Sequence, residues 1–145
     1  MDHDQTGIFT DEHHAAFARD GCVVVKDFLG ASELQQLRAR IQTLLDSFDP
    51  VGHPMTTFAT GERAAGHIGD QYFFDSATTA SYFLEEDAVA NGRLTVEPSR
   101  AVNKIGHGLD IVEPVFSNIA HSAKVKAVVQ KLGYNDPRVL QSMVI

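Results

Sequence analysis

The sequence predicts an α+β fold, with amphipathic helices and a few short strands. Apolar residues recur at steps of three and four between residues 31 and 48, which is the period of a helix with one buried face. Residues 22–25 form a β-branched run and residues 138–145 alternate apolar and polar side chains, both typical of strands. The length of 145 residues fits one domain, which would bury about two thirds of its unfolded surface.

The chain begins with an acidic segment that lacks an apolar stretch, and we expect residues 1–9 to form a disordered tail. The first helix follows. Thr10 is a candidate N-cap, and Gly21 can end the helix. Asp11 and Glu12 complement the positive end of the helix dipole. The β-branched run after Gly21 then predicts a short strand.

A second helix is predicted over residues 30–48, where Ser32 is the candidate N-cap. The residues of its apolar stripe are Leu34, Leu37, Ile41, Leu44, Leu45 and Phe48. Residues 49–70 contain several glycines, two prolines and little periodicity, so we expect a loop there. Loops of this length in compact domains often serve function.

Two short strands are predicted on either side of Asn91-Gly92, a dipeptide typical of tight β-turns. They cover residues 81–87 and 92–98. From residue 99 to 133 the pattern is helical, in two or three pieces interrupted at Gly106–Gly108 and at a proline. The second half of the chain therefore mixes strands with short helices.

The composition disfavours several classes of partner. The formal net charge is -7 and no basic run is interleaved with aromatics, so neither nucleic acid nor an acidic membrane is an expected partner. No apolar stretch has the length of a membrane span, and no signal peptide or peroxisomal tail is seen. Cys22 stands alone, so no internal disulfide can form, and we expect a reducing, cytoplasmic compartment.

Seven histidines raise the question of a metal site. A non-haem iron site needs two histidines and a carboxylate, and on a strand the first pair is spaced His-x-Asp or His-x-Glu, because alternate residues share a face. The sequence has no such pair. His67 and Asp70, like His107 and Asp110, are three residues apart beside glycines, so we expect loop or cap roles. A small metalloprotein that uses these four residues is the lesser alternative.

Nucleophilic catalysis finds little support in the sequence. Cys22 lies in an apolar run, where we expect a buried, inert thiol. Neither a Gly-x-Ser-x-Gly elbow nor a phosphate loop occurs, and we expect the acidic run 85–87 to be a solvated strand end. Lys104, between Asn103 and Ile105, could pair with a ligand carboxylate as a point charge, although most lysines are simply solvated.

Four stretches carry a resemblance to a known family. They read FARDGCVVVKDFLGASELQQLRARI, AVNKIGHGLDIVEPVF, HSAKVKAVVQKLG and DPRVLQSMVI. Together they resemble the phytanoyl-CoA dioxygenase family and, within it, the branch of phytanoyl-CoA dioxygenase domain-containing protein 1. The resemblance covers about residues 10–145, although the 50–70 loop matches poorly. Its most specific parts are the NKIGH and QSM blocks.

The resemblance implies an oxygenase that depends on Fe(II) and 2-oxoglutarate and is built on a double-stranded β-helix, or jelly roll. Decarboxylation of 2-oxoglutarate would drive hydroxylation or a related oxidation of a small organic or acyl-CoA-type substrate. Lys104 matches the family lysine that contacts 2-oxoglutarate, and Met143 matches the methionine that lines the same pocket. Gln141 shares a strand face with Met143, so we expect it to face that pocket too. For His107 we expect a structural hydrogen bond.

The resemblance also implies that the family's His-x-Asp motif, distal histidine and carboxylate-binding arginine lie beyond residue 145. We therefore expect residues 1–145 to form a single incomplete domain, comprising the N-terminal helices and first strands of the jelly roll, with most of the β core missing. Such a chain would lack iron ligands and be inactive alone. The alternative is a short non-catalytic protein that pairs its terminal edge strand with another chain.

Overall fold

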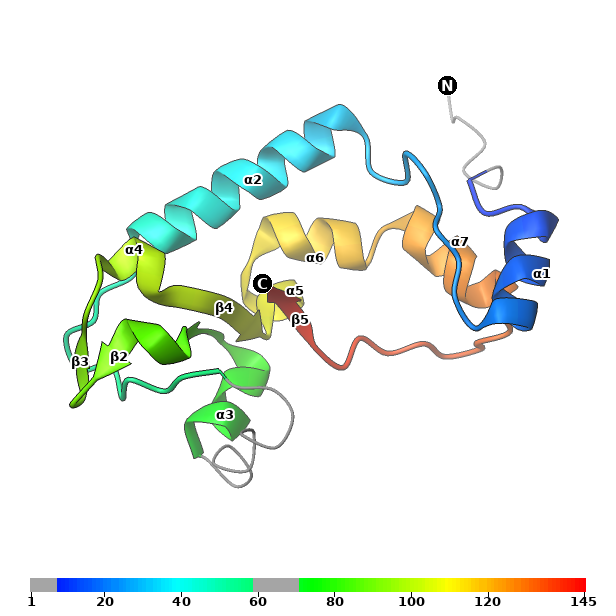
Figure 1. Cartoon of the computed structure of the whole chain (residues 1–145). Coiled ribbons are helices and arrows are strands. Elements are labelled where there is room, and N and C mark those ends of the chain that lie inside the picture. Colours follow the sequence, from blue (N-terminus) through cyan, green and yellow to red (C-terminus); the bar gives the residue numbers. More distant parts are fainter. Residues whose placement is uncertain (1–7, 59–70) are drawn as a thin grey trace.

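The computed structural model describes residues 8–58 and 71–145 (Figure 1). The other residues of the predicted tail and of the predicted 49–70 loop lie outside the described residues. A small antiparallel sheet has the strand order β1-β4-β5, and β2 and β3 form a separate hairpin. The strands are β1 (Ala80–Leu84), β2 (Val89–Ala90), β3 (Arg93–Leu94), β4 (Val102–His107) and β5 (Ser142–Val144). The predicted α+β class is confirmed.

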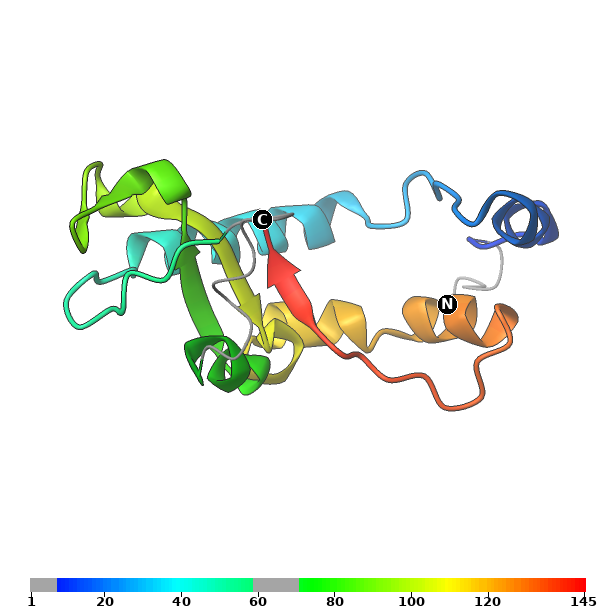
Figure 2. The same cartoon turned by 60° about the horizontal axis from the view of Figure 1, so that its bottom comes forward.

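Helices precede the sheet, connect its strands and extend away from it (Figure 1). They are α1 (Asp11–Asp20), α2 (Ala31–Asp46), α3 (Gln71–Asp75), α4 (Pro98–Ala101), α5 (Leu109–Val112), α6 (Pro114–Ala120) and α7 (Ala123–Lys131), with 3-10 turns η3 (Ser76–Thr78) and η4 (Glu86–Ala88). The α2 and α6 helices run side by side in both views (Figures 1 and 2).

Helix α1 begins and ends where the sequence predicts. The Thr10 hydroxyl accepts a hydrogen bond from the backbone N–H of His13, and Gly21 adopts a left-handed conformation with φ 75° at the C-cap. The strand predicted at residues 22–25 is wrong, because this segment is coil and Val24 is 82% exposed. A β-branched run becomes a strand only beside a pairing partner, and the sheet lies at the other end of the molecule (Figure 1).

The predicted second helix is confirmed as α2, but its N-cap is Gly30 rather than Ser32. The Glu33 carboxylate accepts a 2.7 Å hydrogen bond from the Gly30 N–H, which satisfies one free donor of the first turn. The C-terminal half of the apolar stripe is the buried half. Leu44 packs with Ile105, and Phe48 belongs to a second apolar cluster beside the hairpin.

The turn predicted at Asn91-Gly92 is confirmed, with φ of 53° and 71° at the two positions. Its strands are shorter than predicted, because β2 and β3 pair over two residues each. The earlier part of the predicted strand 81–87 belongs instead to β1, which pairs with β4. The acidic residues 86 and 87 lie in the 3-10 turn η4 and are exposed.

Strand β4 lies within a region that the sequence predicts as helical, and here the prediction is wrong. Residues 102–107 pair with β1 along one edge and with β5 along the other. Six residues are too few for periodicity to separate a strand from a helix, so pairing decides the conformation. The helical prediction holds for much of the remaining region, as α4, α5, α6 and α7.

The sheet presents two chemically different faces. Ile105 of β4 pairs with Tyr82 of β1 and packs against Leu44 of α2, so this face is part of the core. The Tyr82 hydroxyl also donates a 2.9 Å hydrogen bond to the Leu44 carbonyl oxygen. Since side chains alternate along a strand, Lys104 and Gly106 project to the opposite face. The face covered by α2 holds the sheet in place, and the opposite face carries Lys104.

Two ion pairs attach α2 to the helices that follow the sheet. Arg40 binds the buried Glu113 carboxylate with two hydrogen bonds of 2.6 and 2.9 Å. Lys124, which is also buried, donates to Glu33 at 2.7 and 2.5 Å and to the Phe28 carbonyl oxygen at 3.0 Å. Both pairs join residues far apart in sequence, so they fix the position of α2 relative to the start of α6 and of α7.

Among residues 8–58 and 71–145, no helix is long and apolar enough to cross a membrane. The cytoplasmic compartment expected from the sequence stays a prediction. The jelly-roll core implied by the family resemblance also stays a prediction, because the strands described here form small sheets only.

We predict that Arg40→Ala lowers the free energy of unfolding by about 2 kcal/mol, because Glu113 would be left buried without its partner. The cost is below that of a fully buried pair, since the Arg40 side chain is 37% exposed. Urea denaturation followed by circular dichroism measures it. The control is Arg19→Ala, which breaks an exposed pair with Asp20 and should cost less than about 0.5 kcal/mol. Equal losses in the two variants would contradict the assignment.

Candidate functional site

The central feature of the candidate site is the side chain of Lys104, which is only 2% exposed. Its position on β4 is opposite Phe83 of β1, and its Nζ lies 4.6 Å from the centre of that ring. Phe58 and Phe73 contribute two further rings at 3.6 and 5.8 Å. No carboxylate among the described residues forms an ion pair with Lys104. A buried ammonium group without a counter-ion is costly, so it is a candidate binding group.

Burial lowers the pKa of Lys104 to about 8, because transfer from water disfavours the charged form. The pKa of His107 is lowered as well, first by burial and then by the nearby charge of Lys104. At neutral pH the lysine therefore carries a charge and the histidine does not. The charge of Lys104 thus helps to keep the His107 ring neutral.

His107 makes the structural hydrogen bond expected of it. The Ser76 hydroxyl donates to the Phe73 carbonyl oxygen at 2.6 Å, and His107 Nδ1 lies 2.6 Å from the same hydroxyl oxygen. Because the hydroxyl has one hydrogen, Nδ1 of the neutral ring is the donor in the second bond. The ring also packs against Phe73 and Phe83. His107 therefore holds the 3-10 turn η3 and the rings beside Lys104 in position.

The structure places Lys104 and Met143 on the same face of the sheet. Met143 pairs with Gly106, which is two residues along β4 from Lys104. A Cβ atom at Gly106 would lie 2.9 Å from the Met143 Cβ, so only glycine allows β5 to approach this closely. Met143 is half-buried. Gln141, the third residue expected at the site, precedes β5 and is exposed, so it lies at the margin of this face.

The residues considered for a metal site have separate partners. His107 is bound to Ser76, whereas the Asp110 carboxylate lies 3.4 Å from His121 Nε2. His67 and Asp70 lie outside the described residues. Within the part of the chain that the structure describes, no three histidine, cysteine, aspartate or glutamate side chains come together to hold a metal.

The structure differs from the sequence prediction at Cys22 and adds three aromatic rings to the site. Cys22 is exposed rather than buried, because the strand expected to bury it does not form. The rings of Phe58, Phe73 and Phe83 were not predicted as parts of the site. They come from three separate segments, and no spacing in the sequence could have shown that they meet at Lys104.

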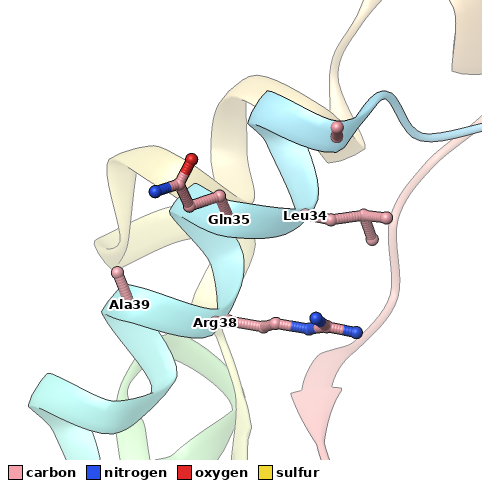
Figure 3. A pocket seen from close by; sticks show the side chains of 5 residues that line it. Leu34, Gln35, Arg38 and Ala39 are labelled. Carbon is pink, nitrogen blue, oxygen red and sulfur yellow. The ribbon is translucent and has the colours of Figure 1, made fainter.

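Other hollows of the molecule lie away from Lys104. One of about 500 Å³ is formed on α2, where Leu34 and Arg38 project from one side of the helix (Figure 3). Another of about 550 Å³ lies between α6, α7 and the coil at residues 136–139. Neither hollow is lined by Lys104 or by Met143.

This chain belongs to the phytanoyl-CoA dioxygenase family, whose sequence model, Phytanoyl-CoA dioxygenase (PhyH), matches residues 17–145. The match includes all of the strands described above, together with Lys104 and Met143. The resemblance found in the NKIGH and QSM blocks is therefore confirmed.

Individual relatives agree with this assignment. Phytanoyl-CoA dioxygenase domain-containing protein 1 homolog of Caenorhabditis elegans is 36% identical over 130 residues, which is 89% of this chain and 45% of the relative. The Bos taurus phytanoyl-CoA dioxygenase domain-containing protein 1 is also 36% identical, with the same coverage of both chains. A phytanoyl-CoA dioxygenase of Arabidopsis thaliana is 34% identical over 97% of this chain and 48% of its own length. The chain spans a little under half the length of these relatives.

We predict that Gly106→Ala separates β5 from β4, because the new Cβ would collide with the Met143 Cβ. Hydrogen–deuterium exchange by NMR should show faster exchange at the amides of residues 142–144 than in the unaltered chain. Adding Met143→Gly to the same chain removes the colliding atom and should restore part of the protection. Unchanged exchange in the single variant would show that β5 does not depend on this close approach.

Proposed function

We propose that this chain supplies the 2-oxoglutarate-binding lysine of an Fe(II)- and 2-oxoglutarate-dependent dioxygenase. The observation that supports the proposal is Lys104, a buried ammonium group that has no carboxylate partner among the described residues. A ligand carboxylate would provide the missing negative charge. Membership of the phytanoyl-CoA dioxygenase family supports the same reading.

In this proposal each residue has a defined task. Lys104 pairs as a point charge with one carboxylate of 2-oxoglutarate and so fixes the orientation of that molecule. Met143 is an adaptable apolar wall on the same face, which excludes water from the charge pair. Gln141 is an amide at the margin of the face and is available for a hydrogen bond to the ligand. Gly106 permits the approach of β5 that brings Met143 into place.

Residues 8–58 and 71–145 bring together no set of side chains that fits iron. Iron bound elsewhere in the dioxygenase would supply the activation of oxygen. The second substrate would be a small organic molecule or an acyl-CoA-type compound, hydroxylated or otherwise oxidised. By itself the chain is proposed to bind and to position, without turnover.

The first test is binding of 2-oxoglutarate to the purified chain, followed by NMR. We expect weak binding with a dissociation constant of about 1 mM, which corresponds to a binding free energy of about 4 kcal/mol. The largest shift changes should fall on β4 and β5. Lys104→Met should abolish binding, whereas Lys26→Met, which alters an exposed lysine, should leave it unchanged. Equal binding by the Lys104 variant would remove the basis of the proposal.

The affinity should also depend on pH in a defined direction. The carboxylate binds the protonated lysine, which predominates below the Lys104 pKa of about 8. We therefore predict constant affinity between pH 6.5 and 7.5 and a fall of about tenfold per pH unit above pH 8. Titrations at five pH values measure this. An affinity that stays constant up to pH 10 would exclude Lys104 as the charged partner.

A second candidate function is partner binding through the edge of the sheet. Within the described residues β5 pairs with β4 along one edge only, and its other edge offers free backbone donors and acceptors. A strand of another chain could pair there without any catalytic role. Sedimentation velocity of the purified chain decides this point. A defined dimer that Val144→Pro disrupts would support strand pairing, and a monomer at all concentrations would count against it.

A further inference from the structure

Three phenylalanine side chains surround the ammonium group of Lys104. Phe58 comes from the coil after α2, Phe73 from α3 and Phe83 from β1. Their ring centres lie 3.6, 5.8 and 4.6 Å from Nζ, all within the range of about 6 Å over which a cation is attracted to an aromatic ring. Since the face of each ring carries partial negative charge, the rings stabilise the charged lysine as well as burying it.

Phe58 differs from the other two rings in its attachments. Phe73 and Phe83 contact each other and both contact His107, so they belong to a larger packed cluster. Phe58 is held through its backbone, because its N–H donates a 2.8 Å hydrogen bond to the Leu84 carbonyl oxygen. The Leu84 N–H in turn donates to the Thr56 carbonyl oxygen at 3.0 Å. The segment is thereby fixed to the edge of β1, with the Phe58 ring nearest to the lysine.

We propose that Phe58 is a positioning residue for Lys104, and that Phe58, Phe73 and Phe83 form an aromatic cage that keeps the ammonium charged and in place before any carboxylate arrives. This inference depends on the proposed function only for the identity of that carboxylate. The evidence for the cage itself is the set of distances between the ring centres and Nζ.

Among the described residues, no charged side chain stabilises the ammonium group of Lys104, so this stabilisation comes from the rings. The titratable group that interacts with it is His107, and the lysine charge keeps that ring neutral by lowering its pKa. No carboxylate of the described residues pairs with the ammonium. Burial lowers the pKa of Lys104 to about 8, so the lysine is still charged at neutral pH. Of the three rings, that of Phe58 lies nearest to that charge.

The cage also determines how a ligand can reach the lysine. Three sides of the ammonium are covered by rings, and Lys104 shares its sheet face with Gly106 and Met143. A carboxylate that reaches the lysine meets an ammonium already desolvated and oriented, and less of the binding free energy is lost to ordering the side chain.

The test measures the pKa of Lys104 by NMR of its side-chain carbon and nitrogen nuclei, without any ligand. Phe58→Leu keeps an apolar wall of similar size but removes the ring charge distribution, and should lower the pKa of Lys104 by roughly one pH unit. Phe58→Tyr keeps an aromatic face and should leave the pKa near its original value. The matched control is Phe17→Leu, which alters a 38% exposed ring on α1 that contacts no ring of the cage and should change nothing.

The direction of the change decides between two roles of Phe58. If the ring only excludes water, Phe58→Leu would leave the pKa of Lys104 unchanged or, by admitting water, raise it, and either result overturns the proposal. If the leucine variant does not fold, a ring-fluorinated phenylalanine placed at position 58 weakens the negative face with little change of shape. It should also lower the pKa. Because no 2-oxoglutarate is present, failure here is distinct from failure of the proposed function.

Discussion

The structure depends on the pairing of β4 along both of its edges. Within the described residues β4 is hydrogen-bonded to β1 on one side and to β5 on the other, and it therefore fixes the positions of Phe83 and Met143 relative to Lys104. Successive side chains of β4 point to opposite sides and so give the sheet two different faces. Ile105 anchors one face to α2, and Lys104 is directed to the other. Burial of an apolar face on one side thus provides the rigidity that a buried charge needs on the other.

A buried lysine without a carboxylate partner is expensive for the folded state, and the surrounding residues show how the cost is limited. The rings of the cage contribute attraction without a counter-charge, and the neutral His107 adds no repulsion at neutral pH. A resident carboxylate would have neutralised the lysine, but it would also have occupied the position that the proposed ligand takes. Natural proteins accept such costs at binding sites.

The family assignment and the geometry bear on different questions. The match over residues 17–145 and the relatives at about 35% identity establish the family. They do not identify which side chain binds which group. The burial of Lys104 and the close approach of Met143 to Gly106 support the roles proposed for these residues more than the exposed position of Gln141 supports the role proposed for it.

The sequence by itself determined the features that depend on neighbours along the chain. Among them are the caps of α1, the apolar stripe of α2 and the turn at Asn91-Gly92. It also singled out Lys104, because the NKIGH block is specific to the family. Only the tertiary structure decided that residues 102–107 form a strand and that residues 22–25 do not, since strands require partners distant in sequence. The cage around Lys104 was likewise decided only by the tertiary structure, because its three rings come from segments that only folding brings together.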